Sequence, residues 1–223
     1  MHTYPLHQTI LFRGLSAIDI EKAMQNVSYT IRQYEKGQTV FGLMEEARQI
    51  GLVLEGKVQA QKYFSNGSQI NVSFRKQGDI IGAAAAFSSD KHYPCEVVAL
   101  EPTKILMFYK SDLLQLMQKD VRILNNFTTE LASTTYLLQQ RLELLSYSGI
   151  AQKAAFYLLI HQRHTGQKKI RIPGSVSNWA LIMNVSRSSL HRELKKLEDK
   201  KILRYQPPII EIVDAQALQE LLG

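Results

Sequence analysis

Between residues 30 and 109 the apolar positions form short runs separated by turn signals. The runs cover residues 40–41, 51–54, 58–64, 70–74, 97–100 and 105–108, and the stretches EKG, EGK, SNG, KQGD and EPT separate them. Many short strands at about ten-residue spacing are typical of a β-sandwich or roll. The pattern predicts an antiparallel β-roll of jelly-roll type within residues 1–119. A small helix over residues 15–26, begun by Ser16 with Asp19 three residues later, is expected before it.

A different period follows, because leucines then recur at intervals of seven. This repeat predicts a long helix over residues 120–147 that pairs with a second copy as a two-stranded coiled coil. A long helix packed on its own domain is the alternative. Thr134 and Thr135 interrupt the apolar stripe, so we expect a polar group beside them. The residues assigned to the dimer interface are Leu124, Phe127, Leu131, Leu138, Leu142 and Leu145.

The last part of the chain, residues 148–223, predicts a sequence of small elements. An amphipathic helix over residues 150–161 precedes a short strand over 168–173 and a helix capped by Ser175 or Ser177. Asn184 stands where a tight turn needs a left-handed residue, and Ser186 can cap the next helix. A hairpin formed by residues 203–205 and 209–212 and a final short helix complete an α+β fold.

The helix that starts at Ser186 has two distinct faces. Leu190, Leu194 and Leu197 make a buried stripe, whereas a second face carries Arg187, Ser188, His191, Arg192 and Lys195. The small Ala180, the turn at Asn184 and the apolar Leu190 have the spacing of a helix-turn-helix, whose second helix enters the DNA major groove. A basic face that is merely solvated is the alternative. The predicted partner is double-stranded DNA.

Charge supports this prediction because it is unevenly placed. The formal net charge is +7, of which residues 150–223 contribute +6 and residues 1–149 contribute +1. A basic small domain beside a nearly neutral larger one indicates a polyanionic partner for the small domain.

The whole chain resembles the Crp/Fnr family of bacterial transcription regulators, and the stretch VSRSSLHRELKKLEDKKIL resembles the family's recognition helix. The resemblance implies a β-roll sensor, a long dimerisation helix and a C-terminal winged helix-turn-helix, acting as a homodimer on a palindromic operator and contacting RNA polymerase. It implies base contacts for Arg187, Ser188, Arg192 and His191, and phosphate contacts for Ser177 and Ser186. Many members carry glutamate where this chain has Ser188, and a hydroxyl does not read cytosine as a carboxylate does.

The resemblance also bears on the effector. Cyclic-nucleotide binders of the family hold the ribose with a glutamate and the cyclic phosphate with an arginine. In the matching stretch, GAAAAFSSDKHYPCEVVAL, Ala83 replaces the glutamate and Tyr93 falls near the place of the arginine. Cyclic AMP is therefore not expected, although Thr134 and Thr135 match positions that reach the base in relatives.

Other effectors stay open. Ala83 and Phe87 could line an apolar pocket for a small organic ligand, or simply pack inside the roll. Haem is an alternative, with His92, Tyr93 or Cys95 as axial ligand. Cys95 as a redox switch is a weaker one.

Several classes are excluded. One cysteine cannot form an internal disulfide, an iron–sulfur cluster or a four-cysteine zinc site. Without a signal sequence or an apolar run of about 18 residues, a cytoplasmic protein with no membrane contact is expected. The sequence has no spacing of residues that is typical of a catalytic site, so we do not expect an enzyme. We also expect no metal site. A sensor module that acts through protein contacts is the alternative function.

Overall fold

The computed structural model describes residues 6–63 and 69–223. The chain divides into two compact units with the boundary after Ser133, here called the N-terminal unit and the C-terminal unit. Helix α4, Val121–Ser146, crosses this boundary, so its two halves belong to different units. Within the described ranges, no helix is long and apolar enough to cross a membrane.

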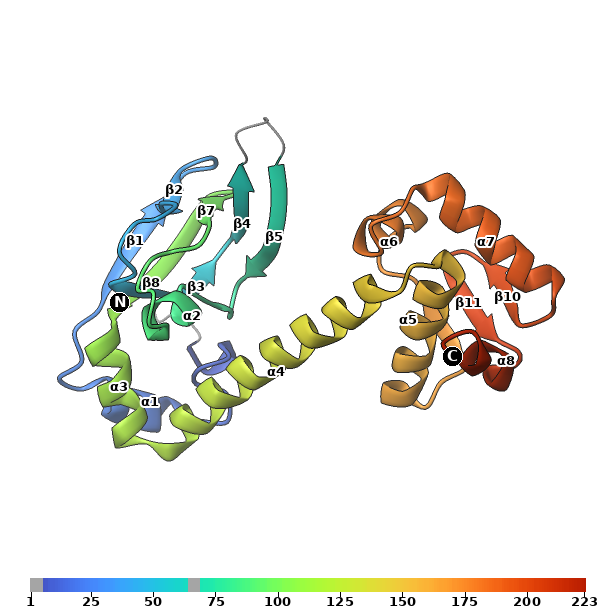
Figure 1. Ribbon diagram of the computed structural model, residues 1–223. Coiled ribbons are helices and arrows are strands. Elements are labelled where there is room, and N and C mark those ends of the chain that lie inside the picture. The colour runs from blue at the N-terminus through green and yellow to red at the C-terminus, as the bar shows by residue number, and fades with distance from the viewer. Residues whose placement is uncertain (1–5, 64–68) are drawn as a thin grey trace. The chain divides into compact units, whose positions relative to one another are not determined.

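Two four-stranded antiparallel sheets build the N-terminal unit (Figure 1). Their orders are β1-β8-β3-β6 and β2-β7-β4-β5. The strands are β1 Thr30–Tyr34, β2 Thr39–Phe41, β3 Gln49–Glu55, β4 Lys57–Tyr63, β5 Gln69–Lys76, β6 Ile80–Ile81, β7 Glu96–Ala99 and β8 Thr103–Tyr109. The predicted antiparallel β-roll is confirmed, while Phe64 and the SNG turn lie outside the described residues.

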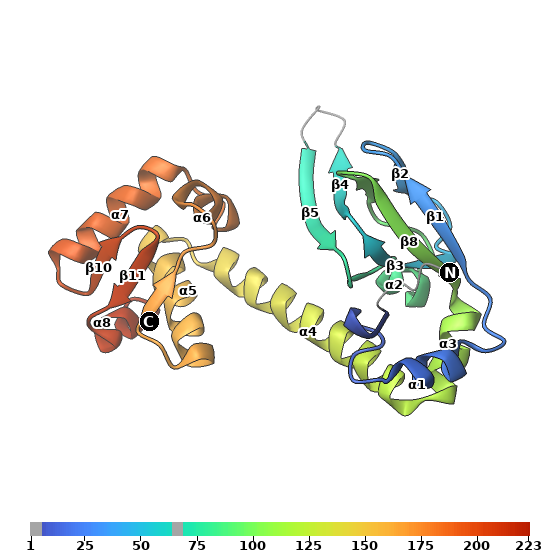
Figure 2. The ribbon, with the colours of Figure 1, turned by 180° about the vertical axis from the view of Figure 1, so that it is seen from behind.

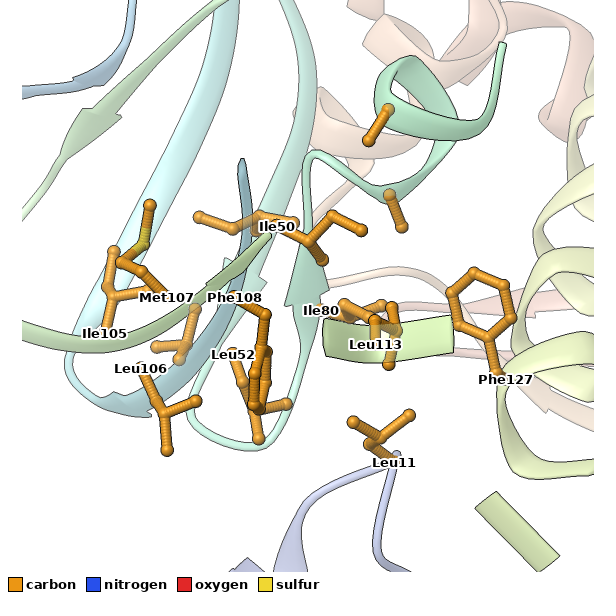
Figure 3. Close-up of a cluster of buried hydrophobic side chains, with 14 of the residues drawn as sticks. Leu11, Ile50, Leu52, Ile80, Ile105, Leu106, Met107, Phe108, Leu113 and Phe127 are labelled. Atoms are coloured by element: carbon orange, nitrogen blue, oxygen red, sulfur yellow. The ribbon is translucent and has the colours of Figure 1, made fainter. Parts of the chain in front are cut away.

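The core of this unit centres on β3 and β8, which pair with each other in the middle of one sheet. Figure 3 shows Ile50 and Leu52 from β3 beside Ile105 and Phe108 from β8. The side chains of these four residues are fully buried. Gly51 permits this approach, because a Cβ there would come within 2.7 Å of the Ile105 side chain.

Short helices complete the N-terminal unit: 3-10 helix η1 Leu6–Gln8, α1 Ala17–Met24, α2 Ala83–Phe87 and α3 Lys110–Lys119. Ser16 caps α1 by accepting from the Asp19 backbone N–H, and the Asp19 side chain accepts from the Ser16 N–H. The helix start predicted at Ser16 is confirmed, and the two hydrogen bonds form a capping box. Helices α1 and α3 contact each other, as Figure 2 shows from behind.

The C-terminal unit is a helix-turn-helix with a three-stranded antiparallel sheet of order β10-β11-β9. Its elements after α4 are α5 Ile150–Thr165, β9 Lys169–Arg171, α6 Val176–Ile182, α7 Arg187–Asp199, β10 Leu203–Gln206, β11 Ile209–Ile212 and α8 Ala215–Glu220. Their order is the predicted one. Helix α5 runs four residues past the expected end at His161, because it stops only at Gly166, which adopts the left-handed conformation that ends helices.

The apolar residues of α4 that were assigned to the dimer interface, here called the leucine seam, divide into an exposed part and a buried part. Leu124, Leu138, Leu142 and Leu145 are exposed, Leu142 by 71%. Phe127 is only 5% exposed and packs on Phe87 in the core of the N-terminal unit, with ring centroids 5.2 Å apart. Leu131 is partly buried against the same core. The first turns of α4 thus place Phe127 in the core of its own unit (Figure 3), which leaves 5% of this residue accessible to a second copy.

Candidate nucleic-acid interface

Helix α7 begins at a serine cap and is anchored by three leucines. The Ser186 hydroxyl accepts from the Ser189 backbone N–H at 3.1 Å, which satisfies one of the free donors of the first turn. Leu190, Leu194 and Leu197 are at most 3% exposed. The opposite face of the helix is thereby turned outward.

The turn between α6 and α7 has the predicted geometry. Asn184 has φ +53°, and the Val185 backbone N–H donates to the Ala180 carbonyl at 3.0 Å. Ala180 is 2% exposed, as expected for the small residue at the point where the two helices cross. One contact was not predicted: the Lys153 side chain, which is buried in α5, donates from Nζ to the Met183 carbonyl at 3.1 Å. A lysine followed directly by Ala154, Ala155 and Phe156 on an amphipathic helix is the sequence signal that could have found it.

The five predicted DNA-contacting residues of α7 all lie exposed: Arg187, Ser188, His191, Arg192 and Lys195. The cationic residues of this set differ in whether a protein carboxylate already pairs with them. Lys195 donates to a Glu198 oxygen at 2.7 Å, and this hydrogen bond raises the pKa of Lys195. Among the residues that the structure describes, neither Arg187 nor Arg192 has an ion-pair partner. Their guanidinium groups are free to bind an anion or a base edge.

The hairpin next to α7 contributes a residue that the sequence did not single out. Tyr205 of β10 is 5% exposed, and its hydroxyl lies 3.2 Å from His191 Nδ1. The Tyr205 backbone N–H donates to Glu198 at 2.8 Å. Burial raises the pKa of Tyr205, whereas the Lys195 hydrogen bond and then the Tyr205 N–H lower the pKa of Glu198.

A hollow of about 450 Å³ lies between the hairpin tip and the start of α6. The Ser175 hydroxyl caps α6 by accepting from the Asn178 N–H at 3.1 Å, which decides the choice left open between Ser175 and Ser177. Ser177 lines the same hollow, beside Arg187. The structure thus brings Ser177 to one edge of the exposed face of α7. The Ser186 hydroxyl is exposed but engaged in its cap.

The candidate effector residues of the N-terminal unit differ in their local contacts. Tyr93 is 3% exposed, donates its hydroxyl to the Gln49 carbonyl at 2.6 Å, and stacks on Phe41 with centroids 4.2 Å apart. Burial raises the pKa of Tyr93 to about 12. Tyr93, Phe41 and Gln49 line a small hollow of about 250 Å³ with charged neighbours, among them Arg32 and Glu45.

The remaining candidates have separate surroundings. Ala83 is buried in α2, and Phe87 packs on Phe127. His92 is partly exposed with Nδ1 2.7 Å from the Asp90 carbonyl, and burial raises the pKa of the Cys95 thiol. Thr134 and Thr135 belong to the C-terminal unit. In the described ranges, no group of three or more His, Cys, Asp or Glu side chains could hold a metal ion.

Comparison with known proteins gives two family matches. Residues 31–120 match the cyclic nucleotide-binding domain, and residues 152–221 match the Crp-like helix-turn-helix domain. The "Cyclic AMP receptor protein" of Thermus thermophilus is 23% identical over 211 residues, with 95% of each chain covered. The "Global nitrogen regulator" of Synechococcus elongatus is also 23% identical, with coverage of 85% of this chain and 88% of the relative.

Solved structures share the fold. CprK in complex with OCPA superposes with a TM-score of 0.64 at 22% identity, covering 91% of this chain and 92% of CprK. A CooA variant from Carboxydothermus hydrogenoformans gives a TM-score of 0.63 at 18% identity, covering 100% of this chain and 97% of CooA. Both units of the chain therefore have counterparts in proteins of known structure.

Proposed function

The chain belongs to the Crp/Fnr family of transcription regulators, and from that premise we propose that it binds a palindromic operator as a homodimer under the control of a small effector other than cyclic AMP. At the coarser level, it is a Crp-like DNA-binding regulator with a cyclic-nucleotide-binding-like domain, and it is not an enzyme.

The exposed face of α7 is the observation that carries this proposal. Arg187 and Arg192 lie on this face, have no protein counter-charge among the described residues, and are held by a helix whose other face is buried. An arginine fork donates to guanine O6 and N7 together, a pairing worth roughly 1–3 kcal/mol of discrimination. Ser177 and Ser186 are the proposed phosphate contacts, and Ser188 and His191 complete the reading set.

The exposed leucines of α4 support the homodimer. Leu138, Leu142 and Leu145 are apolar and exposed on one helix, and a second copy of that helix would bury them. A twofold dimer presents two recognition helices about 34 Å apart, which matches half-sites one helical turn apart on DNA. RNA polymerase is the partner through which such binding would alter transcription.

The side chains in the sensor stretch argue against cyclic AMP, even though one relative is named a cyclic AMP receptor protein. Ala83 has no hydrogen-bonding side chain for a ribose, and the Tyr93 hydroxyl is engaged with Gln49. Isothermal titration should therefore detect no micromolar binding of cyclic AMP. Heat of binding in that range would refute this part of the proposal.

Haem is the second effector candidate, and the fit depends on one residue. Tyr93 is committed to Gln49 and the Cys95 thiol is half-buried with a raised pKa, so His92 is the ligand that the surroundings leave accessible. Haem held there would supply a gas-sensing iron. Addition of haem should give a Soret band that His92→Ala abolishes, if this candidate is correct; an unchanged band would exclude His92.

Unbiased selection of DNA from a random pool tests the function directly. We expect an enriched palindrome, with enrichment that changes when cell extract supplies the effector. An asymmetric minimal site would contradict the dimeric arrangement. Absence of any enriched sequence, with and without extract, would refute operator binding and favour a sensor that acts through protein contacts.

A further inference from the structure

We propose that Tyr205 fixes the proton position on His191, so that His191 presents its Nε2–H to the major groove and selects a base edge that carries an acceptor. The inference rests on the proposed DNA-binding function and adds a specificity-determining residue outside the recognition helix. Its basis is the 3.2 Å contact between the Tyr205 hydroxyl and His191 Nδ1, with the rings edge to face at a centroid distance of 5.4 Å.

Several contacts fix the position of Tyr205, so its hydroxyl can orient the His191 ring. Tyr205 is 5% exposed, it pairs with Ile210 in the antiparallel hairpin, and its backbone N–H donates to Glu198. The other Glu198 oxygen accepts from Lys195, whose amino group lies 5.7 Å from the Tyr205 ring centroid. The phenol therefore has little freedom to leave His191.

Hydrogen-bond requirements then assign the proton. Burial raises the pKa of Tyr205, so the phenol keeps its hydrogen near neutral pH. A tyrosine hydroxyl at a packed position usually finds a hydrogen-bond partner, and within the described residues the acceptor that the part-buried Tyr205 hydroxyl contacts is His191 Nδ1. In a neutral imidazole one nitrogen accepts and the other donates, so the proton is on Nε2.

Protonation of the ring leaves this result unchanged. Both nitrogens of an imidazolium donate, so Nδ1–H would donate to the phenol oxygen and Nε2 would still carry a proton. No protein partner for Nε2 is found in the described ranges, and His191 is exposed on the face of α7 that carries Arg187 and Arg192. Nε2–H is thus available to the ligand in either protonation state.

A donor at this position reads a defined set of base edges. Guanine N7 and O6, adenine N7 and thymine O4 accept hydrogen bonds in the major groove, whereas cytosine presents its N4 amino donor. The base that His191 touches should therefore be one with an acceptor, and cytosine should be disfavoured. One hydrogen bond of ordinary strength corresponds to about three- to tenfold discrimination.

DNA selection with variants tests the role of the pair. His191→Ala identifies the operator position that His191 reads, and Tyr205→Phe should reduce the bias against cytosine at that position about three- to tenfold while preferences elsewhere stay. Tyr157→Phe is the matched control, because Tyr157 also lies against a histidine of this unit, His161, with ring centroids 4.3 Å apart. It should leave the selected sequence unchanged.

Two results would overturn the inference: an unaltered preference at that position in Tyr205→Phe, or an equal loss of affinity for every sequence. If the unmodified protein enriches no sequence, the proposed function fails instead. The proton position can then still be measured on the free protein by ¹⁵N NMR of His191. We expect an unprotonated Nδ1 and a protonated Nε2, with a mixture in Tyr205→Phe. A neutral ring with its proton on Nδ1 would overturn the inference without reference to DNA.

Discussion

Replacement of Lys153 by methionine tests whether the helix-turn-helix is held by a buried hydrogen bond. Lys153 is 8% exposed, and its amino group donates to the Met183 carbonyl at the end of α6, directly before the turn at Asn184. Methionine keeps a long unbranched side chain but removes the donor. Within the described part of the chain, no carboxylate pairs with Lys153.

Two opposing effects decide the magnitude. An unsatisfied buried carbonyl costs about 1–3 kcal/mol, and the negative end of the α6 dipole increases the value of a cationic donor there. Removing a buried amino group also removes its desolvation cost, which offsets part of the loss. We expect Lys153→Met to lower the free energy of unfolding of the C-terminal unit by about 1–2 kcal/mol. The midpoint of thermal unfolding should fall by about 4–8 °C per kcal/mol.

Tryptophan fluorescence is the assay, because Trp179 is the single tryptophan of the chain and is fully buried in the C-terminal unit. Urea unfolding followed at Trp179 therefore reports on this unit. Lys168→Met is the control: it removes the same amino group from an exposed site and should change stability by less than about 0.5 kcal/mol. A Lys153→Met protein that is as stable as the original, or more stable, would refute the reasoning, since the relief of desolvation would then cancel or exceed the loss of the hydrogen bond.

Other predictions concern base reading, assembly and pH. Arg192→Ala should reduce the preference at one base pair by roughly 1–3 kcal/mol in competition binding. Lys195→Ala should weaken binding to all DNA sequences alike. Equal losses of affinity for specific and random DNA in Arg192→Ala would count against base reading. Leu142→Glu should weaken dimerisation about tenfold or more in sedimentation analysis, because it places a charge in an apolar seam. Leu137 has a similar exposure, 63% against 71% for Leu142, and Leu137→Glu should not weaken dimerisation. The pKa of Glu198 in the folded protein is depressed below its ordinary value of 4.5, so the ionised Glu198 stabilises the fold above pH 4.5 and this contribution is lost as the pH falls through the folded-state pKa. Glu198→Gln should remove this part of the acid dependence of urea unfolding. An unchanged acid dependence in Glu198→Gln would refute the prediction.

The fold could be predicted because local patterns and tertiary structure agree over most of the chain. The cap at Ser16, the turn at Asn184 and the leucine stripe of α7 are each determined by neighbours within a few residues. The seven-residue repeat of α4 predicted the helix but not which of its apolar residues are buried within the chain. It treats Phe127 and Leu142 as equivalent, but Phe127 is in the core of the N-terminal unit and Leu142 is exposed. A periodic stripe indicates which face of a helix is apolar without indicating what covers it.

The candidate interface could be predicted as a set of positions but not as a set of interactions. The two-residue alternation of β10 places Tyr205 inward, yet nothing in the sequence indicates that its hydroxyl meets His191 on another element. Lys153 and Met183 are separated by 30 residues and meet only through the packing of α5 against the helix-turn-helix. Long-range polar contacts depend on side-chain placement in the folded unit, which a local pattern does not contain.

These two contacts have a common consequence for how the recognition helix works. Lys153 of α5 binds the turn that precedes α7, and Tyr205 of the hairpin binds a side chain on α7. The orientation of α7 and the proton position on His191 are therefore set from outside the helix, by α5 and by the hairpin of β10 and β11. A site must be held within about 0.5 Å of its productive geometry to act. It follows that base preference in this chain belongs to the whole C-terminal unit, and that relatives with the same residues on α7 but a different residue at the position of Tyr205 need not share it.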